Sequence, residues 1–297
     1  MTLTTPINAM LTRVIGSTDI RGQGTKHANE DINPFSLLDE GAVFTKKNTP
    51  PFGRHPHAGA FILTICLMGS LNNMTIKDGK EVTEEFGPGP FLLALSCNRG
   101  VVHDEHTSSD QPTKLLQLVW MTGDQSSDCS FEHVDKPKVL KEDSYEIMLC
   151  CGTFRQVASG ISCRQNPSVT VLIIKMSSGS MFQTDEFRDG NVFVYSVDYE
   201  EKRGPLVVND SEVPSSHIAD MTMDASNFHL KIENKNEHSI SVLIGYGKPI
   251  QPKCKKLLMF NGFIFAPTED ELKNKEDEFK QVGAERFGQK PDSCNLM

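Results

Sequence analysis

Short apolar runs separated by turn-forming residues constrain this chain more than any other feature of its sequence. Each run has the length of a β-strand, and Gly, Pro, Asn and Asp residues lie between the runs. This pattern is typical of all-β sandwiches and barrels. The runs are AFILTICLM (60–68), GPFLLAL (89–95), KLLQLVWM (114–121), VTVLIIKM (169–176), NVFVYSV (191–197) and SISVLIGY (239–246).

Both halves of the chain repeat this coarse pattern of strand, turn and strand, which permits a duplicated β-barrel, although the two halves show no sequence repeat. The segment between Met121 and Tyr145 is polar and charged, as a linker between two compact units is. We therefore predict one unit over residues 1–130 and a second over residues 131–297. None of the apolar runs approaches the ~18 residues that a membrane-spanning helix needs, so we expect a protein that does not enter a membrane.

One helix is predicted, near the end of the chain from about Glu269 to Val282. Thr268 is its expected N-cap, and Glu271 three residues later completes a capping box. Leu272 and Phe279 recur at helical spacing, so we expect this side of the helix to pack on a barrel.

Two pairs of possible metal ligands stand out in the N-terminal half. His55 and His57 flank Pro56, and His103 and Glu105 flank Asp104 in the segment GVVHDEH. In a β-strand, residues i and i+2 point to the same side, so each pair would project together. A single pair of this kind is more often a surface feature, but a second matched pair on another predicted strand favours a metal site.

Three imidazoles and one carboxylate suit Fe(II), Mn, Ni, Cu or Zn, and leave room for a further ligand on a six-coordinate ion. Asp104 and His106 are the rival ligands, because His103 and His106 would share a face if this segment were helical. Val101 and Val102 favour a strand. The other histidines are interpreted as structural or surface residues: His27, His133, His217, His229 and His238.

Composition argues against several other functions. The formal net charge of −9 disfavours direct nucleic-acid binding. Neither GxGxxG nor GxxxxGK[ST] nor GxSxG occurs, so nucleotide binding and a serine-hydrolase elbow are not expected. The eight cysteines show no CxxC spacing, and we expect reduced thiols and an intracellular location.

Several segments together resemble the pirin family of bicupins, over roughly residues 12 to 290. The resemblance rests, in chain order, on DINPFSLLDE (31–40), FGRHPHAG, GPGP followed by RGVVHDE, LLQLVW, GKPI, and NGFIFAPTEDEL followed by RFG. It implies two stacked cupin barrels with a short C-terminal helix. One Fe(II) per chain would be held by His55, His57, His103 and Glu105 in the N-terminal barrel, and the second barrel would be metal-free.

The resemblance also implies a function. Some pirins resemble quercetin 2,3-dioxygenases, so one hypothesis is an iron-dependent dioxygenase acting on a small flavonol-like substrate, with Glu105 as metal ligand and general base. Animal pirins are described as redox-sensitive nuclear coregulators, so the alternative is a non-enzymatic iron protein that binds a protein partner. Another divalent transition metal could replace iron. We expect a monomer located in the cytoplasm, the nucleus or both.

The chain departs from the family pattern just beyond the HPH motif. Where the family usually has Arg-Gly-Phe-Glu, this chain has Ala58-Gly59-Ala60-Phe61. If strand alternation continues, Phe61 keeps the parity of His55 and His57 and would narrow the pocket beside the metal. The alternative is that Phe61 simply fills the core.

Overall fold

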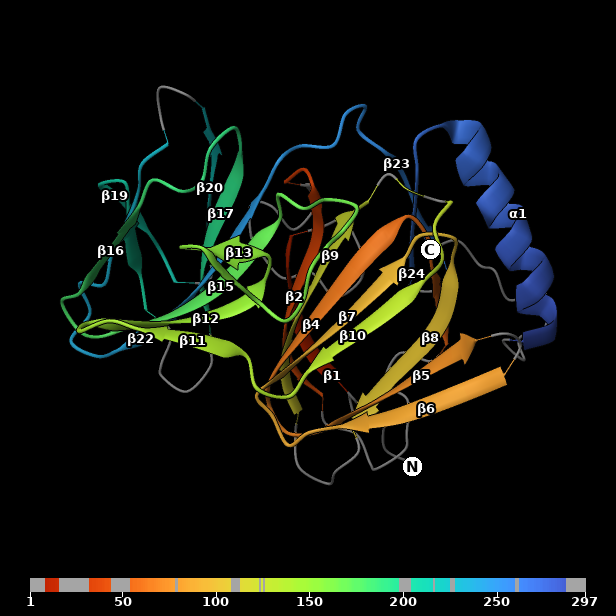
Figure 1. Cartoon of the computed structure of the whole chain (residues 1–297), viewed down its shortest axis with the longest axis horizontal. Coiled ribbons are helices and arrows are strands. Elements are labelled where there is room, and N and C mark those ends of the chain that lie inside the picture. Colours follow the sequence, from red (N-terminus) through yellow and green to blue (C-terminus); the bar gives the residue numbers. More distant parts are fainter. Residues whose placement is uncertain are drawn as a thin grey trace, which may run out of the picture.

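The structure is a computed structural model of the 297-residue chain. It describes residues 9–15, 32–43, 54–77, 80–107, 113–122, 124, 126–197, 204–215, 217–224, 228–259 and 262–286. Within these ranges the chain forms twenty-four strands and a single helix (Figure 1). No helix in these ranges is long and apolar enough to span a membrane. The prediction of an all-β chain with a short C-terminal helix is confirmed.

The N-terminal half consists of two antiparallel sheets. The larger has the order β1-β2-β9-β4-β7-β10 and the smaller the order β3-β8-β5-β6. The strands of the larger sheet are β1 (Ala9–Ile15), β2 (Phe35–Val43), β4 (Ala60–Met68), β7 (Phe91–Cys97), β9 (Thr113–Met121) and β10 (Ser130–Val134). Those of the smaller sheet are β3 (His55–His57), β5 (Leu71–Lys77), β6 (Lys80–Phe86) and β8 (Val101–Thr107).

The C-terminal half repeats this plan, with a larger sheet of order β11-β12-β15-β22-β17-β20 and a smaller one of order β16-β21-β18-β19. The larger sheet contains β11 (Lys138–Lys141), β12 (Tyr145–Cys151), β15 (Thr170–Met176), β17 (Gly190–Val197), β20 (Ile218–Met223) and β22 (Ile240–Gly247). The smaller contains β16 (Met181–Thr184), β18 (Leu206–Val208), β19 (Ser211–Val213) and β21 (Leu230–Glu233), and β13 (Thr153–Phe154) pairs with β14 (Val157–Ala158). Each half is thus a double-sheet jelly roll.

The two halves pack through one shared apolar cluster. Phe35 and Trp120 of the N-terminal half lie in it together with Phe193 and Tyr195 of the C-terminal half. The rings of Phe35 and Phe193 meet edge to face at 5.0 Å, and the Tyr195 hydroxyl donates a 2.6 Å hydrogen bond to the buried Glu40 carboxylate. Edge-to-face rings and satisfied buried polar groups are what a well-packed interior contains.

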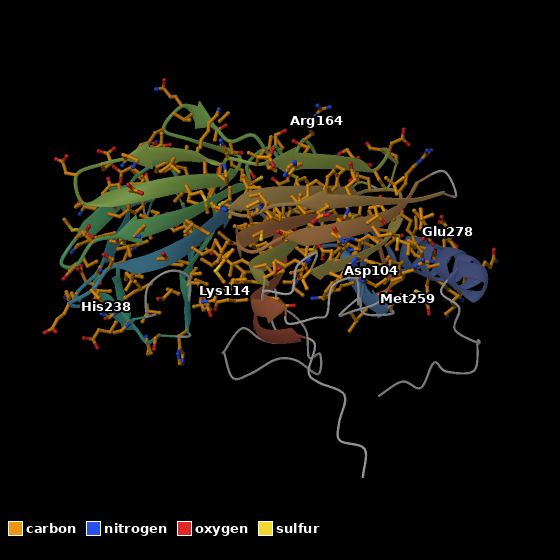
Figure 2. The ribbon with its side chains drawn as sticks, turned by 90° about the horizontal axis from the view of Figure 1, so that it is seen from below. Asp104, Lys114, Arg164, His238, Met259 and Glu278 are labelled. Carbon is orange, nitrogen blue, oxygen red and sulfur yellow. The ribbon has the colours of Figure 1, made fainter. Side chains whose placement is uncertain are left out.

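The end of the chain returns to the N-terminal half. Strands β23 (Lys255–Met259) and β24 (Gly262–Ala266) form a hairpin, and helix α1 (Glu269–Arg286) follows it at the edge of the molecule (Figure 1). Phe265 N–H donates to the Ala58 carbonyl at 2.9 Å, next to β3. Figure 2 shows Met259 and Glu278 of this C-terminal segment at the same end of the molecule as Asp104, with His238 at the opposite end.

Helix α1 has the predicted start and the predicted packing face. Glu271 N–H donates to Thr268 Oγ1 at 3.2 Å, while Thr268 N–H donates to the Glu271 carboxylate at 3.1 Å, which is the capping box. Leu272 and Phe279 are buried in a cluster with Val102 of β8, so the helix packs on the N-terminal half. The side chain of Val282 lies outside the described residues.

A division of the chain between residues 130 and 131 remains a prediction. β10, at this point of the chain, pairs with β7 of the N-terminal half. The helix assigned by that division to the second unit contacts the first.

Candidate metal centre

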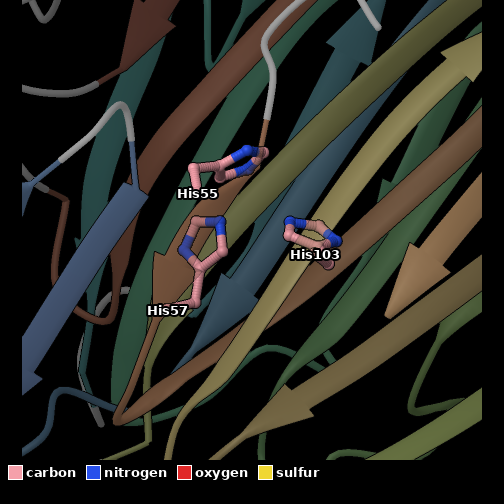
Figure 3. Close-up of side chains that lie close together, drawn as sticks. All are labelled: His55, His57 and His103. Carbon is pink, nitrogen blue, oxygen red and sulfur yellow. The ribbon is translucent and has the colours of Figure 1, made fainter. Parts of the chain in front are cut away.

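Two neighbouring strands bring the predicted histidines together. β3 pairs antiparallel with β8 so that His55 lies opposite His103 and His57 lies opposite Val101. Because alternate residues of a strand share a face, His55, His57 and His103 point to the same side of the sheet. Figure 3 shows the three imidazole rings around a common space.

The geometry of this group suits a metal ion. One potential ligand nitrogen from each of the three histidines lies within 4.8 Å of those of the other two. The ring centroids are 4.5–5.0 Å apart, and all three side chains are buried. Uncharged imidazole nitrogens at this separation, with no cysteine among them, are a donor set for a first-row transition metal.

His103 has one ring nitrogen engaged and one without a partner. Its Nδ1 lies 3.3 Å from the amide oxygen of Asn73, while Nε2 is buried and has no hydrogen-bond partner among the described residues. Burial lowers the pKa of His103 to about 4, so the ring is neutral at pH 7. A neutral ring that donates from Nδ1 to Asn73 presents the Nε2 lone pair, which is the form that binds a metal.

His57 accepts a hydrogen bond from a residue far along the chain, in strand β24. The backbone N–H of Phe263 in β24 donates to His57 Nδ1 at 3.1 Å. Burial, with the neighbouring His55 and His103, holds the pKa of His57 well below its usual range. In the neutral ring this contact leaves the proton on Nε2. Binding an ion there requires that proton to leave and the contact with Phe263 to change.

Glu105 lies on the same face of β8 as His103, but its carboxylate already has partners. Thr64 Oγ1 donates to one oxygen at 3.1 Å and Gln117 Nε2 to the other at 2.7 Å. Burial raises the pKa of Glu105, opposed by His55 and by these hydrogen bonds. Glu105 is not part of the group within 4.8 Å, so its roles as ligand and base stay predictions.

The rival ligands point the other way. Asp104 and His106 alternate with His103 and Glu105 along β8, and His106 Nε2 lies 3.2 Å from the Asn72 amide nitrogen instead. Of the remaining histidines that the structure describes, His133 pairs with Asp135 and His229 with Asp185. His27 lies outside the described residues.

The expectation that Phe61 narrows the metal pocket is wrong. Phe61 stacks on Trp120 at 4.6 Å in the cluster between the two halves. The reason is Gly59, whose φ of +60° places a left-handed residue between β3 and β4 and reverses the alternation. Ile62 and Thr64, rather than Phe61, face the cavity beside His103.

Two cavities lie on this side of β8, and His103 is the one histidine that lines either of them. The inner one is about 10 Å³ and is lined by His103, Glu105 and Asn73, among others. The outer pocket is about 570 Å³, and its lining includes Val101 of β8. Leu95 and Phe131 line both cavities, so the two cavities are close to each other. A volume of this size falls in the range of small-molecule sites.

Sequence reasoning did not identify Asn73, Thr64, Gln117 or Phe263 as parts of this site. Thr64 of β4 and Gln117 of β9 lie opposite each other, and both side chains point toward Glu105. They could be recognised only once it is known that β4 and β9 face β8. Phe263 contributes its backbone N–H, so no side-chain type marks it.

The sheet arrangement and the paired histidine strands define a bicupin. Residues 16–121 match the family model described as Pirin, so this part of the chain is similar to the pirin family. A comparison with curated proteins finds no match.

Two solved structures illustrate the shared fold. A quercetin 2,3-dioxygenase from Acinetobacter baumannii superposes with a TM-score of 0.70 at 16% identity, covering 93% of this chain and 91% of that one. The bacterial pirin YhhW from Escherichia coli, in complex with nickel(II), has a TM-score of 0.61 at 15% identity, covering 81% of this chain and 93% of that one.

Proposed function

We propose that this protein is a metal-dependent dioxygenase of the quercetinase type, with one Fe(II) per chain and a flavonol-like substrate. The observation that carries the proposal is the buried histidine group His55, His57 and His103. A pocket of about 570 Å³ lies near it, lined by Val101, which is two residues from His103 on β8. The neighbouring quercetin 2,3-dioxygenase fold supports the reaction class.

The metal would be held by the three imidazoles, joined by Glu105. When bound, it supplies Lewis acidity that lowers the pKa of a coordinated hydroxyl, together with an open coordination position. Dioxygen is the oxidant, and it adds across a ring bond of the flavonol, which is oxidised.

Glu105 is the residue of this chain that takes up the proton of the substrate hydroxyl. Burial raises its pKa, which makes it a stronger base than an exposed carboxylate. Gln117 and Thr64 fix its two oxygens at 2.7 and 3.1 Å, so the carboxylate is oriented before substrate arrives.

Substrate would occupy the outer pocket. Its walls combine the apolar Leu95, Val101 and Phe131 with the Thr75 hydroxyl, and Arg99 and Asp128, which pair at 2.9 Å, also line it. Apolar walls with a few polar groups suit an aromatic ring that carries hydroxyls. Leu95 and Phe131 line both cavities, so a shift of these side chains would open the way from the outer pocket to His103.

The test measures metal content and oxygen uptake on the same preparations. Protein purified without chelators should contain about one iron per chain. Quercetin should then drive oxygen consumption that His103→Ala abolishes. His106→Ala is the matched control, since it removes a histidine from the opposite face of the same strand and should keep both metal and activity. Equal metal in the wild type and in His57→Ala would reject the site.

A second candidate function is a redox-sensitive iron protein that binds a protein partner, in the cytoplasm or nucleus. One contact favours it: Phe263, whose backbone bonds to His57, lies on the hairpin that leads into the surface helix α1. A change of ligation at His57 would alter this hydrogen bond and could thereby shift the hairpin and helix α1 at the surface. Full iron occupancy without oxygen uptake on several flavonols would favour this function over the enzyme.

A further inference from the structure

Asn73 occupies a special place in the inner cavity. It lies on β5, directly opposite Glu105 of β8, and its side chain is 3% exposed. It lines the cavity of about 10 Å³ together with His103 and Glu105. A buried amide in an interior needs partners for both its oxygen and its nitrogen.

Only half of this amide is satisfied among the described residues. The Asn73 oxygen lies 3.3 Å from His103 Nδ1, but its nitrogen has no hydrogen-bond partner there. His103 Nε2 also lacks one. A donor and an acceptor are thus left open on two side chains of the same small cavity. Buried polar groups are rarely left unpaired, and a bound water or ion is one of the usual partners of such groups.

We propose that Asn73 has two roles in the metal centre, one for its amide oxygen and one for its amide nitrogen. Its oxygen accepts from His103 Nδ1–H and so fixes the tautomer in which Nε2 presents its lone pair to a metal. Its nitrogen donates a hydrogen bond to a small oxygen- or nitrogen-ended ligand in the inner cavity. Asn73 is therefore a positioning residue for His103 and a binding residue for that ligand.

The cavity sets the size of this ligand. A volume of about 10 Å³ is at the lower limit for one water molecule, so the ring of a flavonol does not fit without rearrangement. The class that fits is a water-sized molecule or the end of a small anion such as azide. This inference rests on the proposed metal site, because an ion would anchor the ligand.

Asn72 provides a control of the same residue type on the same strand. Its side chain points to the opposite face of the sheet, where its amide nitrogen lies 3.2 Å from His106 Nε2. Substitution of Asn72 removes another buried amide and leaves His55, His57 and His103 unchanged.

The experiment uses the full chain loaded with Co(II), whose visible absorption reports ligation. Asn73→Leu removes both roles, Asn73→Asp keeps an acceptor for His103 but lacks the donor, and Asn72→Leu is the control. Metal affinity is measured by competition with a chelator. Azide affinity is measured by absorption titration of the fully loaded proteins, and chemical unfolding verifies that each variant folds.

Asn73→Leu should bind metal about 10–100-fold more weakly, as loss of a residue that orients a ligand does. At full occupancy it should also bind azide about tenfold more weakly, since one hydrogen bond to a charged group is lost. Asn73→Asp should keep metal affinity near that of the wild type and lose azide affinity. Asn72→Leu should match the wild type in both measurements.

Wild-type affinities in Asn73→Leu would overturn the inference. If Asn73→Leu does not fold, wild-type azide affinity in Asn73→Asp would overturn the donor role. A wild-type protein that binds no metal would instead contradict the proposed function itself, so the two failures are distinct.

Discussion

The interiors of the two halves differ although their sheets follow the same plan. Between its two sheets the C-terminal half is filled with aliphatic and aromatic side chains, among them Leu172, Ile174, Phe182 and Ile232. The corresponding space of the N-terminal half holds a buried polar group as well as apolar side chains. The polar residues are the three histidines, Glu105, Asn73 and Gln117. The shared fold therefore requires a filled interior but leaves its chemistry open.

The polar interior also changes what holds the N-terminal half together. Apolar side chains share this interior, since Leu95 and Phe131 line the inner cavity with His103. Further apolar contacts lie in the cluster shared with the C-terminal half and beneath the hairpin and helix of the C-terminal segment. Buried polar groups contribute little to stability even when paired. We infer that this half relies in part on the rest of the chain for its stability.

The largest effect is expected at the boundary between the halves. Restoring the family residues with Ala58→Arg and Phe61→Glu would place an arginine beneath α1 and a carboxylate against Trp120, both fully buried. An unpaired buried charge typically costs 3–5 kcal/mol, so the double variant should lose at least about 5 kcal/mol or fail to fold. Chemical unfolding of the metal-free protein measures this loss. A stable variant with faster quercetin turnover would show that Phe61 does face the metal.

The two interiors can be compared directly by removing one ring from each. Phe182→Ala in the C-terminal half should cost about 3–5 kcal/mol, because it empties part of an apolar core. His103→Ala in the metal-free protein should cost about 1–3 kcal/mol, the penalty for leaving Asn73 without its partner. Metal affinity should fall in His103→Ala and should be unchanged in Phe182→Ala. Equal losses of stability in the two variants would contradict the inferred difference between the two interiors.

Lowering the pH should also reduce the folding stability of the N-terminal half, because His103 is buried as a neutral ring. His103 titrates at about 4 in the folded chain and near 6.5 when unfolded, so the unfolded state binds more protons between these values. Its contribution is fully present above pH 6.5 and is lost as the pH falls to about 4, by about 3 kcal/mol. His57, whose pKa is also lowered, adds to the loss, while the raised pKa of Glu105 opposes it.

Unfolding of chelator-treated wild type and His103→Ala at several pH values between 4 and 7 measures this difference. The variant should lose less stability than the wild type over this window. Parallel curves for the two proteins would mean that His103 is not buried as a neutral ring.

Local periodicity predicted the histidine group well, because residues two apart in a strand share a face whatever the rest of the fold does. The same rule failed for Phe61, since one left-handed residue, Gly59, reverses the alternation. Asn73 and Phe263 could not be found this way. Asn73 meets His103 only through the register of β5 against β8, and Phe263 is 206 residues from His57. Such long-range contacts depend on the packing of the whole chain.

The smallest effect tests whether the end of the chain supports the N-terminal interior. Thr268→Ala removes the exposed hydroxyl that caps α1 and should lower the free energy of unfolding by about 1 kcal/mol. Thr268 is far along the chain from the histidines. If α1 and the hairpin hold β3 in place, the loss should appear as faster amide exchange in β3 and β24. The strands β15 and β22 of the C-terminal half should be unaffected. Ser178→Ala, which removes an exposed hydroxyl bonded to the Asn236 carbonyl in the C-terminal half, is the matched control and should leave β3 unchanged. Faster exchange throughout both halves would mean that they unfold as one unit, with no special link between the C-terminal segment and the metal centre.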